Sequence, residues 1–373
     1  MKQKLGIRIF AHSWVSDWNH GNAHFLRGLA RELMRQGHEL RCYEEAGGWS
    51  LTNLMQEGEI AKVSIASFRR TYPELDVRFY RAGDGLASFL DEELAGADLV
   101  LLHEWNEPGL ISEVLARRPR FGFRALFLDT HHRALSSPEA LRRLPLEAFD
   151  GVLAFGETIR RIYRERFGVE RVWTFHEAAD PSVFYPRPLP KENDLLWIGN
   201  WGDEERTEEL HEFLISPARA LTASGRRVRV YGVRYPEPAK ALLRQAGIEY
   251  AGYLPNLAAP EVYAHSRVAL HVPRRQYADG LSGIPTIRVF EALACGVPLV
   301  CSPWSDSEGL FRPGKDYFVA GDGGEMQAIL VQLLADDNAR RQLAASGLES
   351  IRQHHTCSHR AAELTRIYGE LRG

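Results

Sequence analysis

The sequence contains few cysteines, only four in 373 residues: Cys42, Cys295, Cys301 and Cys357. None of them forms a C-x-x-C pair or another spacing typical of zinc sites, so the sequence gives no sign of a zinc module. Two of the four lie in apolar stretches, where a free cysteine behaves as a small core residue. Scattered thiols of this kind are typical of a reducing compartment, and we expect a cytoplasmic protein.

Long apolar runs are also absent, so no transmembrane segment is predicted. Residues 1–4 lead straight into a predicted strand, without the apolar region of a signal peptide. The net charge of −3 gives no reason to expect nucleic acid or an anionic membrane as a partner. The length and the apolar fraction of 45% fit an ordinary globular protein of two domains.

The dinucleotide fingerprint G-x-G-x-x-G does not follow the first predicted strand, Leu5–Phe10, which weakens the hypothesis of an NAD-dependent enzyme. A polar loop, a helix over His24–Gln36 and a strand over Glu39–Tyr43 come next. This order predicts an α/β fold with parallel strands. A further helix is expected near Leu51–Ile60.

Polar side chains follow two buried strands in the first half of the chain. The strand Ala97–Leu102 is followed by residues 103–106 (His-Glu-Trp-Asn), and the strand Arg124–Asp129 by residues 130–133 (Thr-His-His-Arg). Ligands of open α/β sheets gather at such strand ends. Asp129 and His131 alternate along an extended backbone, so both can project the same way, and an imidazole suits proton transfer. The alternative is a capping aspartate beside two structural histidines.

In the second half, residues 283–301 predict a loop, a short helix, a glycine stop and a buried strand. Thr286 can cap the helix, and Gly296 suits the left-handed residue after its end. Arg288 and Glu291 are three residues apart and therefore neighbours near the helix N-terminus, where a phosphate and a diol would both find partners. The alternative is a surface ion pair on an amphipathic helix.

A second anion-binding element is predicted where a strand opens into the glycine loop Gly199–Gly202, with Arg206 just after it. Backbone amides of such a loop with a nearby cation form a cradle for an anion. The predicted helix over Arg206–Leu214 follows. No metal site is expected, because His354, His355 and His359 have no carboxylate or cysteine at ligand spacing.

Residues 290–300 (FEALACGVPLV) resemble a signature of nucleotide-sugar glycosyltransferases of the GT-B fold. The resemblance extends to residues 29–40, to the D-P-x-x-F-x-P element ending at Pro186, and to the glycine loop. It implies two Rossmann-like parallel-sheet domains facing each other across a cleft: residues 1–186 on the acceptor side and 187–355 on the nucleotide side. Residues 356–373 are expected to form a helix that returns to the first domain.

The resemblance also implies roles for single residues. Glu291 matches the glutamate that binds the ribose hydroxyls, whereas the second, sugar-contacting glutamate of the family is replaced by Gly283. Arg206 matches one member of a basic pair that holds the diphosphate, and Arg274 stands where the family usually has a serine, which favours a second phosphate contact. His131 is the closest match to a functional histidine of the first domain.

The chain is therefore expected to move a sugar from a nucleoside diphosphate sugar to an acceptor, a small molecule, a glycan or a protein, without a metal or a resident cofactor. Residues Gly283–Arg288 and 129–132 look most like the CgeB-like (spore-maturation) branch of these enzymes. Asp129 and His131 both remain candidates for the base, and retention or inversion stays open. A nucleotide-sugar epimerase and a catalytically silent binding protein are the alternatives.

Overall fold

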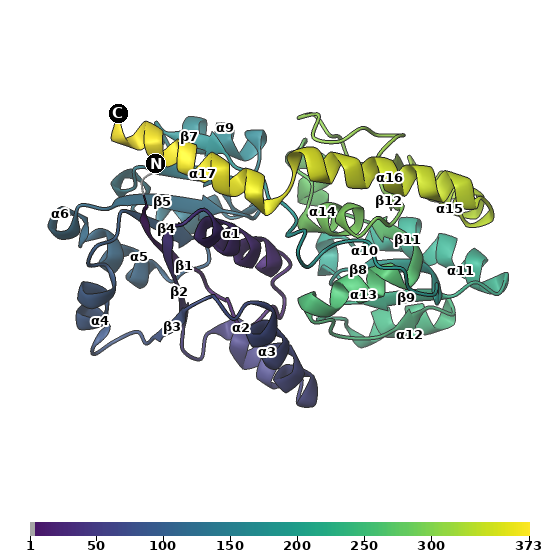
Figure 1. The fold of residues 1–373 in the computed structure, drawn as a ribbon. Helices are drawn as coiled ribbons and strands as arrows, with labels where there is room; N and C mark the ends of the chain where they lie inside the picture. The colour runs from purple at the N-terminus through teal and green to yellow at the C-terminus, as the bar shows by residue number, and fades with distance from the viewer. Residues whose placement is uncertain (1–3) are drawn as a thin grey trace. The chain divides into compact units, whose positions relative to one another are not determined.

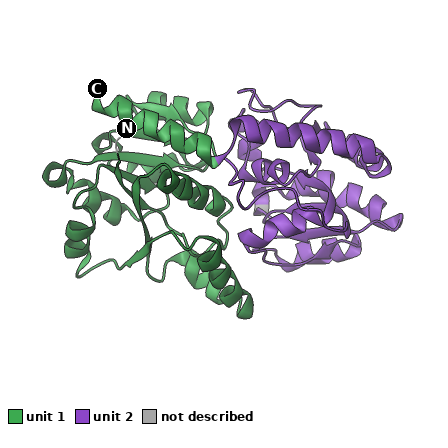
Figure 2. Ribbon diagram, viewed as in Figure 1, with its two compact units in different colours: residues 1–177, 357–373 green, residues 178–356 purple. Residues whose placement is uncertain are grey.

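Two compact units make up the protein. The computed structural model describes residues 4–373. Unit 1 consists of residues 1–177 and 357–373, of which 1–3 lie outside the described part, and unit 2 of residues 178–356 (Figure 2). Each unit is built on one parallel β-sheet with helices packed against it (Figure 1). Among the described residues, no helix is both long and apolar enough to span a membrane.

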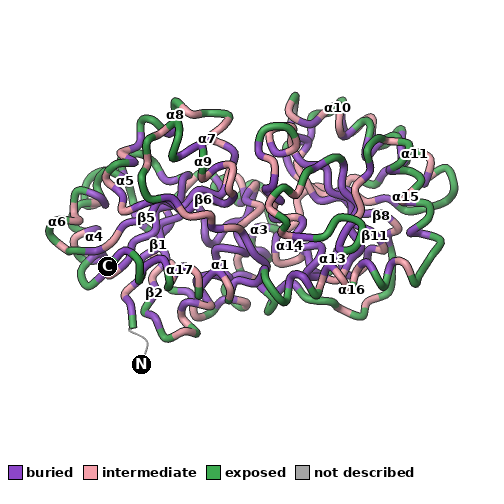
Figure 3. The backbone as a smooth tube through the Cα atoms, turned by 90° about the horizontal axis from the view of Figure 1, so that it is seen from above, coloured by how far each residue is buried: buried purple, intermediate pink, exposed green. Residues whose placement is uncertain are grey.

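The sheet of unit 1 has seven strands in the order β3-β2-β1-β4-β5-β6-β7. Its strands are β1 (Gly6–Phe10), β2 (Glu39–Glu45), β3 (Val77–Tyr80), β4 (Leu99–His103), β5 (Arg124–Asp129), β6 (Gly151–Ala154) and β7 (Val172–Thr174). The connecting helices are α1 (Ala23–Arg35), α2 (Trp49–Met55), α3 (Glu59–Thr71), α4 (Leu86–Glu93), α5 (Pro108–Leu115), α6 (Arg118–Phe121), α7 (Arg133–Ser136), α8 (Pro138–Arg142) and α9 (Glu157–Arg166). The central strands are buried along their length, as a sheet covered on both faces requires (Figure 3).

Unit 2 repeats this plan with six strands in the order β10-β9-β8-β11-β12-β13. Its strands are β8 (Asn193–Ile198), β9 (Val228–Tyr231), β10 (Glu249–Tyr250), β11 (Ser266–His271), β12 (Leu299–Cys301) and β13 (Phe318–Val319). The helices are α10 (Thr207–Leu210), α11 (Ser216–Ala223), α12 (Glu237–Gln245), α13 (Ala259–Ala264), α14 (Ile287–Ala294), α15 (Gly323–Ala335) and α16 (Asp337–His354). The α/β class with two parallel sheets was therefore predicted correctly.

The chain passes between the units at Glu177 and again at Thr356. Ala179 donates its backbone N–H to His355 O at 3.0 Å, so the two crossings run side by side. Pro186 packs on unit 2, where a Cβ at Gly296 would come 3.1 Å from its Cγ. The D-P-x-x-F-x-P element thus belongs to unit 2, whereas from the sequence it was expected at the end of the first domain.

The last helix, α17 (Cys357–Arg372), is part of unit 1 and packs against α1 (Figure 1). Its apolar stripe of Ala361, Leu364, Ile367 and Leu371 is buried. Arg360 donates from Nε to His176 O at 2.9 Å, which ties the start of the helix to the end of the preceding unit 1 segment.

Two helices differ from the sequence prediction. The single helix expected near Leu51–Ile60 is wrong, because Gly58 has a φ of +65° and separates α2 from α3. The helix expected over Arg206–Leu214 begins at Thr207 and widens into a π-turn at residues 211–215. Pro217 lies just beyond this turn and has no N–H for a regular α-helical bond, so the ladder of hydrogen bonds adjusts there.

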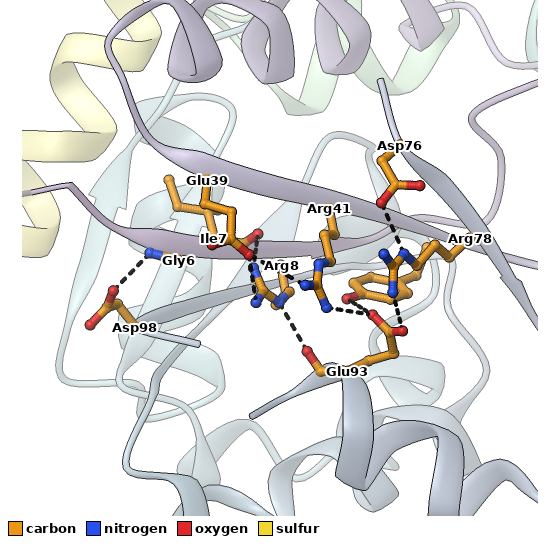
Figure 4. A network of polar contacts seen from close by, with 10 residues as sticks. Gly6, Ile7, Arg8, Glu39, Arg41, Asp76, Arg78, Glu93 and Asp98 are labelled. Atoms are coloured by element: carbon orange, nitrogen blue, oxygen red, sulfur yellow. Dashed lines mark hydrogen bonds and ion pairs between the residues drawn. The ribbon is translucent and has the colours of Figure 1, made fainter. Parts of the chain in front are cut away.

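Glu93, at the end of α4, is buried at the centre of a polar network in unit 1 (Figure 4). Its carboxylate accepts hydrogen bonds from Tyr43 Oη at 2.8 Å, from Arg41 Nη1 at 3.1 Å and from Arg78 Nη1. Burial alone would raise the pKa of Glu93, but these donors outweigh it and lower the pKa. One carboxylate thus links side chains of β2 and β3 beneath the sheet edge.

Two glycines in terminal helices give a matched test of packing. Gly347 in α16 is buried, and an added Cβ would lie 2.7 Å from Leu293 Cδ2 and 2.8 Å from Asp316 O. Gly369 in α17 is exposed, and an added Cβ meets no atom within 4 Å. We expect Gly347→Ala to lower the unfolding free energy by about 1–3 kcal/mol through overpacking. Gly369→Ala should raise it by about 0.5–1 kcal/mol through helix propensity.

Urea unfolding followed by circular dichroism measures both variants against the wild type. Equal effects of the same sign for the two alanines would contradict the packing of α16 against α14.

Candidate functional site

In unit 2 the loops that follow neighbouring strands meet at one edge of the sheet. β11 pairs with β8 on one side and with β12 on the other, all parallel. The loop Gly199–Gly202 leaves β8, and the segment Val272–Arg275 leaves β11. Helix α14 precedes β12 and begins after Thr286. The residues predicted from the second half of the sequence therefore come from elements that surround the carboxyl ends of adjacent strands.

Arg206 joins two of these loops. Its guanidinium donates from Nη1 to Val272 O at 3.0 Å and from Nη2 to Asn200 O, and it lies 5.2 Å from the centroid of the Trp197 ring. Burial, with a smaller contribution from nearby Arg274, lowers the pKa of Arg206 to about 10, so the group stays charged at neutral pH. Its Nε has no hydrogen-bond partner among the described residues. The geometry thus fixes a positive charge at the strand ends.

The glycines of the loop after β8 leave room for this arrangement. Gly202 has a φ of +84°, and an added Cβ would lie 3.1 Å from Arg206 Nε. At Gly199 an added Cβ would come 2.7 Å from the Trp197 ring. A side chain at position 202 would therefore displace the Arg206 guanidinium, and one at position 199 would displace the Trp197 ring.

Glu291 lies on the first turns of α14 and is completely buried. Its Oε1 accepts from Asn256 Nδ2 at 3.0 Å, and its Oε2 accepts from Tyr263 Oη at 3.4 Å and from Arg288 Nη1 at 2.5 Å. The side chain of Arg288 is 26% exposed, whereas that of Glu291 is 0% exposed. The alternative of a surface ion pair on an amphipathic helix is therefore wrong, because the carboxylate is held inside the unit.

Thr286 occupies the N-cap position of α14, as predicted, but its side chain makes no capping bond. Its Oγ1 lies 2.9 Å from Nε2 of His271, the last residue of β11. Burial, with smaller contributions from nearby Arg206 and Arg288, lowers the pKa of His271 to about 3. The neutral imidazole thus connects the end of β11 to the start of α14. Gly296 has a φ of +64° just past the helix end, as predicted.

Arg274 forms an ion pair with Glu205, and Glu205 also accepts from Gln276 Nε2 at 2.9 Å. The positive charge of Arg274 is therefore already paired with a carboxylate. Gly283 has a φ of +91°, and an added Cβ would lie 2.7 Å from Cγ of Glu308. Ser307 Oγ would be nearer still, at 2.6 Å, so a glutamate at position 283 would not fit unless the side chains of both Ser307 and Glu308 moved.

In unit 1, Asp129 ends β5 and is completely buried. Its Oδ2 accepts from Tyr163 Oη at 2.6 Å, and its Oδ1 accepts from the backbone N–H of His131 at 2.9 Å. Burial raises the pKa of Asp129 to about 6, although these two donors act in the opposite direction. Burial, reinforced by the Asp129 charge, raises the pKa of neighbouring Glu104 well above its usual range. The two carboxyl groups therefore do not ionise together.

His131 differs from Asp129 in its surroundings. It is partly exposed, and its ring centroid lies 3.9 Å from that of His132 and 5.3 Å from that of Trp105. Asp129 accepts a hydrogen bond from the backbone N–H of His131, whereas the side chain of His131 is partly exposed to solvent. The expected pair is thus adjacent, but only His131 is partly open to solvent.

Several polar residues of these strand ends were missed in the sequence. Asn256 and Tyr263 contact Glu291, and His271 contacts Thr286. In unit 1, His12 lies close to His20 and His103. None of these missed residues was assigned a role from the sequence, and the only available signal was a position near a predicted strand end or loop.

Comparison with solved structures identifies the architecture. Sucrose-phosphate synthase from Thermosynechococcus elongatus matches with a TM-score of 0.66 and 15% identity, over 99% of this chain and 99% of that one. Anabaena HepE, solved with UDP and glucose, matches with a TM-score of 0.69 and 13% identity, over 98% of this chain and 100% of that one. The chain has the GT-B fold. Identities this low establish the fold alone.

Two sequence comparisons add to these structural matches, and the first concerns mainly unit 2. Residues 206–366 match the family model described as glycosyl transferase-like. The O-antigen chain mannosyltransferase B of Escherichia coli is 32% identical over 113 residues, which is 30% of this chain and 27% of that protein. The chain therefore matches little more than a quarter of the length of this curated relative.

The low pKa of His271 predicts a pH dependence of stability. In the unfolded chain its pKa is 6.5, and in the folded protein it is about 3, so unfolding takes up a proton between these values. The folded state is favoured fully above pH 6.5 and loses this contribution as the pH falls toward 3. His271→Gln cannot take up the proton. We expect the stability advantage of the wild type over the variant to shrink by about 2 kcal/mol between about pH 7 and pH 5.

Urea unfolding at both pH values measures this difference. His354→Gln is the control, because His354 is exposed and should leave the difference from wild type unchanged. A constant difference for His271→Gln would mean that the imidazole titrates normally in the folded protein.

Proposed function

We propose that the protein is a glycosyltransferase that moves a sugar from a nucleoside diphosphate sugar to an acceptor. The observation that carries this proposal is the buried Glu291 on the first turns of α14, with the charged Arg206 at the neighbouring strand ends. The glycosyl transferase-like match covers both residues. The UDP bound to Anabaena HepE supports a nucleoside diphosphate as the common part of the donor.

Glu291 would accept hydrogen bonds from the two ribose hydroxyls. A carboxylate offers about four lone-pair sites, and Arg288, which is partly exposed, can move away to free one of them. Hydrogen bonds to a charged group contribute about 1.5–3 kcal/mol each, so this contact would supply much of the affinity for the nucleoside.

The diphosphate would lie against Arg206, the backbone amides of Gly199–Gly202 and the N-terminus of α14. These groups are held in place before the donor arrives, so they can stabilise the charge of the departing diphosphate with little rearrangement. Arg274 and Arg288 would add to this if they exchanged their glutamate partners for phosphate oxygens. Such fixed charges are the basis for proposing that transfer proceeds without a divalent ion.

For the acceptor proton, the geometry favours His131 over Asp129. Asp129 is buried, and both of its oxygens already accept hydrogen bonds, so it is a positioning residue for the His131 backbone. His131 is partly exposed and carries an imidazole, the usual group for proton transfer near neutral pH. A base in this role would favour inversion at the anomeric carbon.

Two finer assignments rest on the sequence. The CgeB-like branch is proposed on Gly283, the segment that leads from it into α14, and the histidines after β5. A cytoplasmic location is proposed on the four scattered cysteines, all of which are buried in the structure.

The test of the donor site uses Glu291→Gln, which keeps the shape of the side chain and removes its charge. UDP, GDP and ADP, and their glucose or mannose derivatives, are screened for a rise in melting temperature of the wild type. For the nucleotide that binds, the variant should bind about 10- to 100-fold more weakly, since one or two charged hydrogen bonds are weakened. Isothermal titration calorimetry measures the affinities.

Glu237→Gln is the matched control in the same unit, because Glu237 lies on the surface in an ion pair with Lys240. It should bind the nucleotide like the wild type. Unchanged affinity in Glu291→Gln, or no response of the wild type to any nucleotide, would overturn the proposal. Conversion of the donor sugar without an acceptor would instead identify an epimerase, and tight binding with no turnover or hydrolysis of any donor would identify a binding protein.

A further inference from the structure

Three histidines of unit 1 lie close together at the carboxyl ends of the neighbouring strands β1 and β4. His12 follows β1, His20 lies in the loop before α1, and His103 is the last residue of β4. β1 and β4 are adjacent, with Phe10 opposite Leu102, so His12 and His103 leave the sheet side by side. One ring nitrogen from each histidine lies within 4.8 Å of the others. Among the described residues, this is the only such group of possible metal ligands.

The three imidazole rings are in close contact, but the buried nitrogens of His12 and His20 do not form hydrogen bonds with the other rings. The centroids of His12 and His20 are 4.2 Å apart, and those of His12 and His103 are 5.4 Å apart. Both ring nitrogens of His20 and Nδ1 of His12 are buried and have no hydrogen-bond partner among residues 4–373. His20 is only 5% exposed. Buried polar atoms nearly always have a partner, so nitrogens of this kind indicate a bound species.

The chemistry of the cluster suits a metal cation. Burial lowers the pKa of His12 to about 4, and burial together with the neighbouring imidazoles lowers the pKa values of His20 and His103. The rings are therefore neutral at physiological pH, the form in which imidazole binds metals. Neutral nitrogen donors without carboxylates favour zinc, cobalt, nickel or copper over magnesium and calcium.

The nearest fixed charges do not oppose a cation strongly. Arg27 pairs with Asp17 at 3.4 Å, and both side chains are buried. Arg133 lies 3.8 Å from Glu104, the residue after His103. Asp17 offsets the positive charge of Arg27. For Arg133 the offset comes from the single negative charge that the neighbouring carboxyl groups of Glu104 and Asp129 carry between them.

His103 also has partners that orient its ring. Its Nε2 lies 2.9 Å from Thr130 Oγ1, and its Nδ1 accepts from the backbone N–H of Trp105 at 3.3 Å. A metal-bound imidazole usually donates its other ring N–H to an oxygen acceptor, and Thr130 Oγ1 is in position to be that acceptor. The long bond from Trp105 is the weaker of the two, so it is the one that His103 can give up.

We propose that His12, His20 and His103 bind one transition-metal dication of the zinc class through one ring nitrogen each. With metal–nitrogen distances of about 2.0–2.1 Å, the three nitrogens would draw together to about 3.4 Å from one another. Three protein ligands leave a fourth position for water or another oxygen ligand. The ion would tie the loop between β1 and α1 to the end of β4. This site is independent of the proposed donor site in unit 2.

The test uses the full chain, purified without a polyhistidine tag and stripped with a chelator. Co²⁺ is titrated into the apoprotein, and the visible absorption of cobalt with nitrogen ligands is recorded together with the melting temperature. We expect one equivalent per chain, a rise in melting temperature on binding, and displacement of Co²⁺ by Zn²⁺. His20→Gln and His12→Gln should each weaken binding by more than about tenfold.

His354→Gln is the control, since it removes an exposed histidine outside the cluster and should bind Co²⁺ like the wild type. Circular dichroism of each apoprotein establishes that the variants are folded. No saturable cobalt spectrum in the wild type, or equal binding by wild type and His20→Gln, would overturn the proposal and leave water as the occupant. Because neither readout uses a nucleotide, the result is separate from that of the donor-site test.

Discussion

The structure depends on one constraint: each parallel sheet is covered by helices, so polar side chains are admitted mainly where the strands end. β4 and β5 in unit 1 and β8 and β11 in unit 2 are almost entirely buried. Polar groups within such strands would lose water without gaining partners, apart from the backbone ladder. His103, Asp129 and His271 are each the last residue of a strand. The fold itself therefore collects titratable groups along one edge of each sheet.

This regularity explains why the fold was predictable from the sequence. The run Arg124–Asp129 was predicted as a strand and is β5 with the same bounds, because a continuous apolar run can form only a strand covered on both faces or a buried helix. The glycine at position 296 marked the end of α14, since its backbone conformation is one that side chains disfavour. An apolar run and a glycine stop each depend only on neighbouring residues, so they predict local structure without knowledge of the tertiary contacts.

The partners of the charged residues were not predictable, because they come from distant parts of the chain. Glu205, which pairs with Arg274, and Asn256, which contacts Glu291, stand in segments that carry no motif of their own. Asp129 accepts a hydrogen bond from Tyr163, which lies in α9 and far from it in the sequence. His103 is far from His12 and His20 in the sequence, so no ligand spacing was available to reveal the three as a group. The strand ends could therefore be predicted from the sequence. The burial and the partners of each side chain at these ends depend on tertiary contacts, which could not.

The arginines of unit 2 show how much these contacts matter. Arg274 and Arg288 each pair with a glutamate, so an anion must compete for them with a carboxylate that is already in place. Arg206 instead donates to two peptide carbonyls, and within the described residues no carboxylate forms an ion pair with it. Carbonyl oxygens hold the guanidinium without cancelling its charge, and burial strengthens its field. An anion arriving at the ends of β8 and β11 would therefore be attracted first by Arg206, the one cation of the three whose charge the folded chain leaves unbalanced.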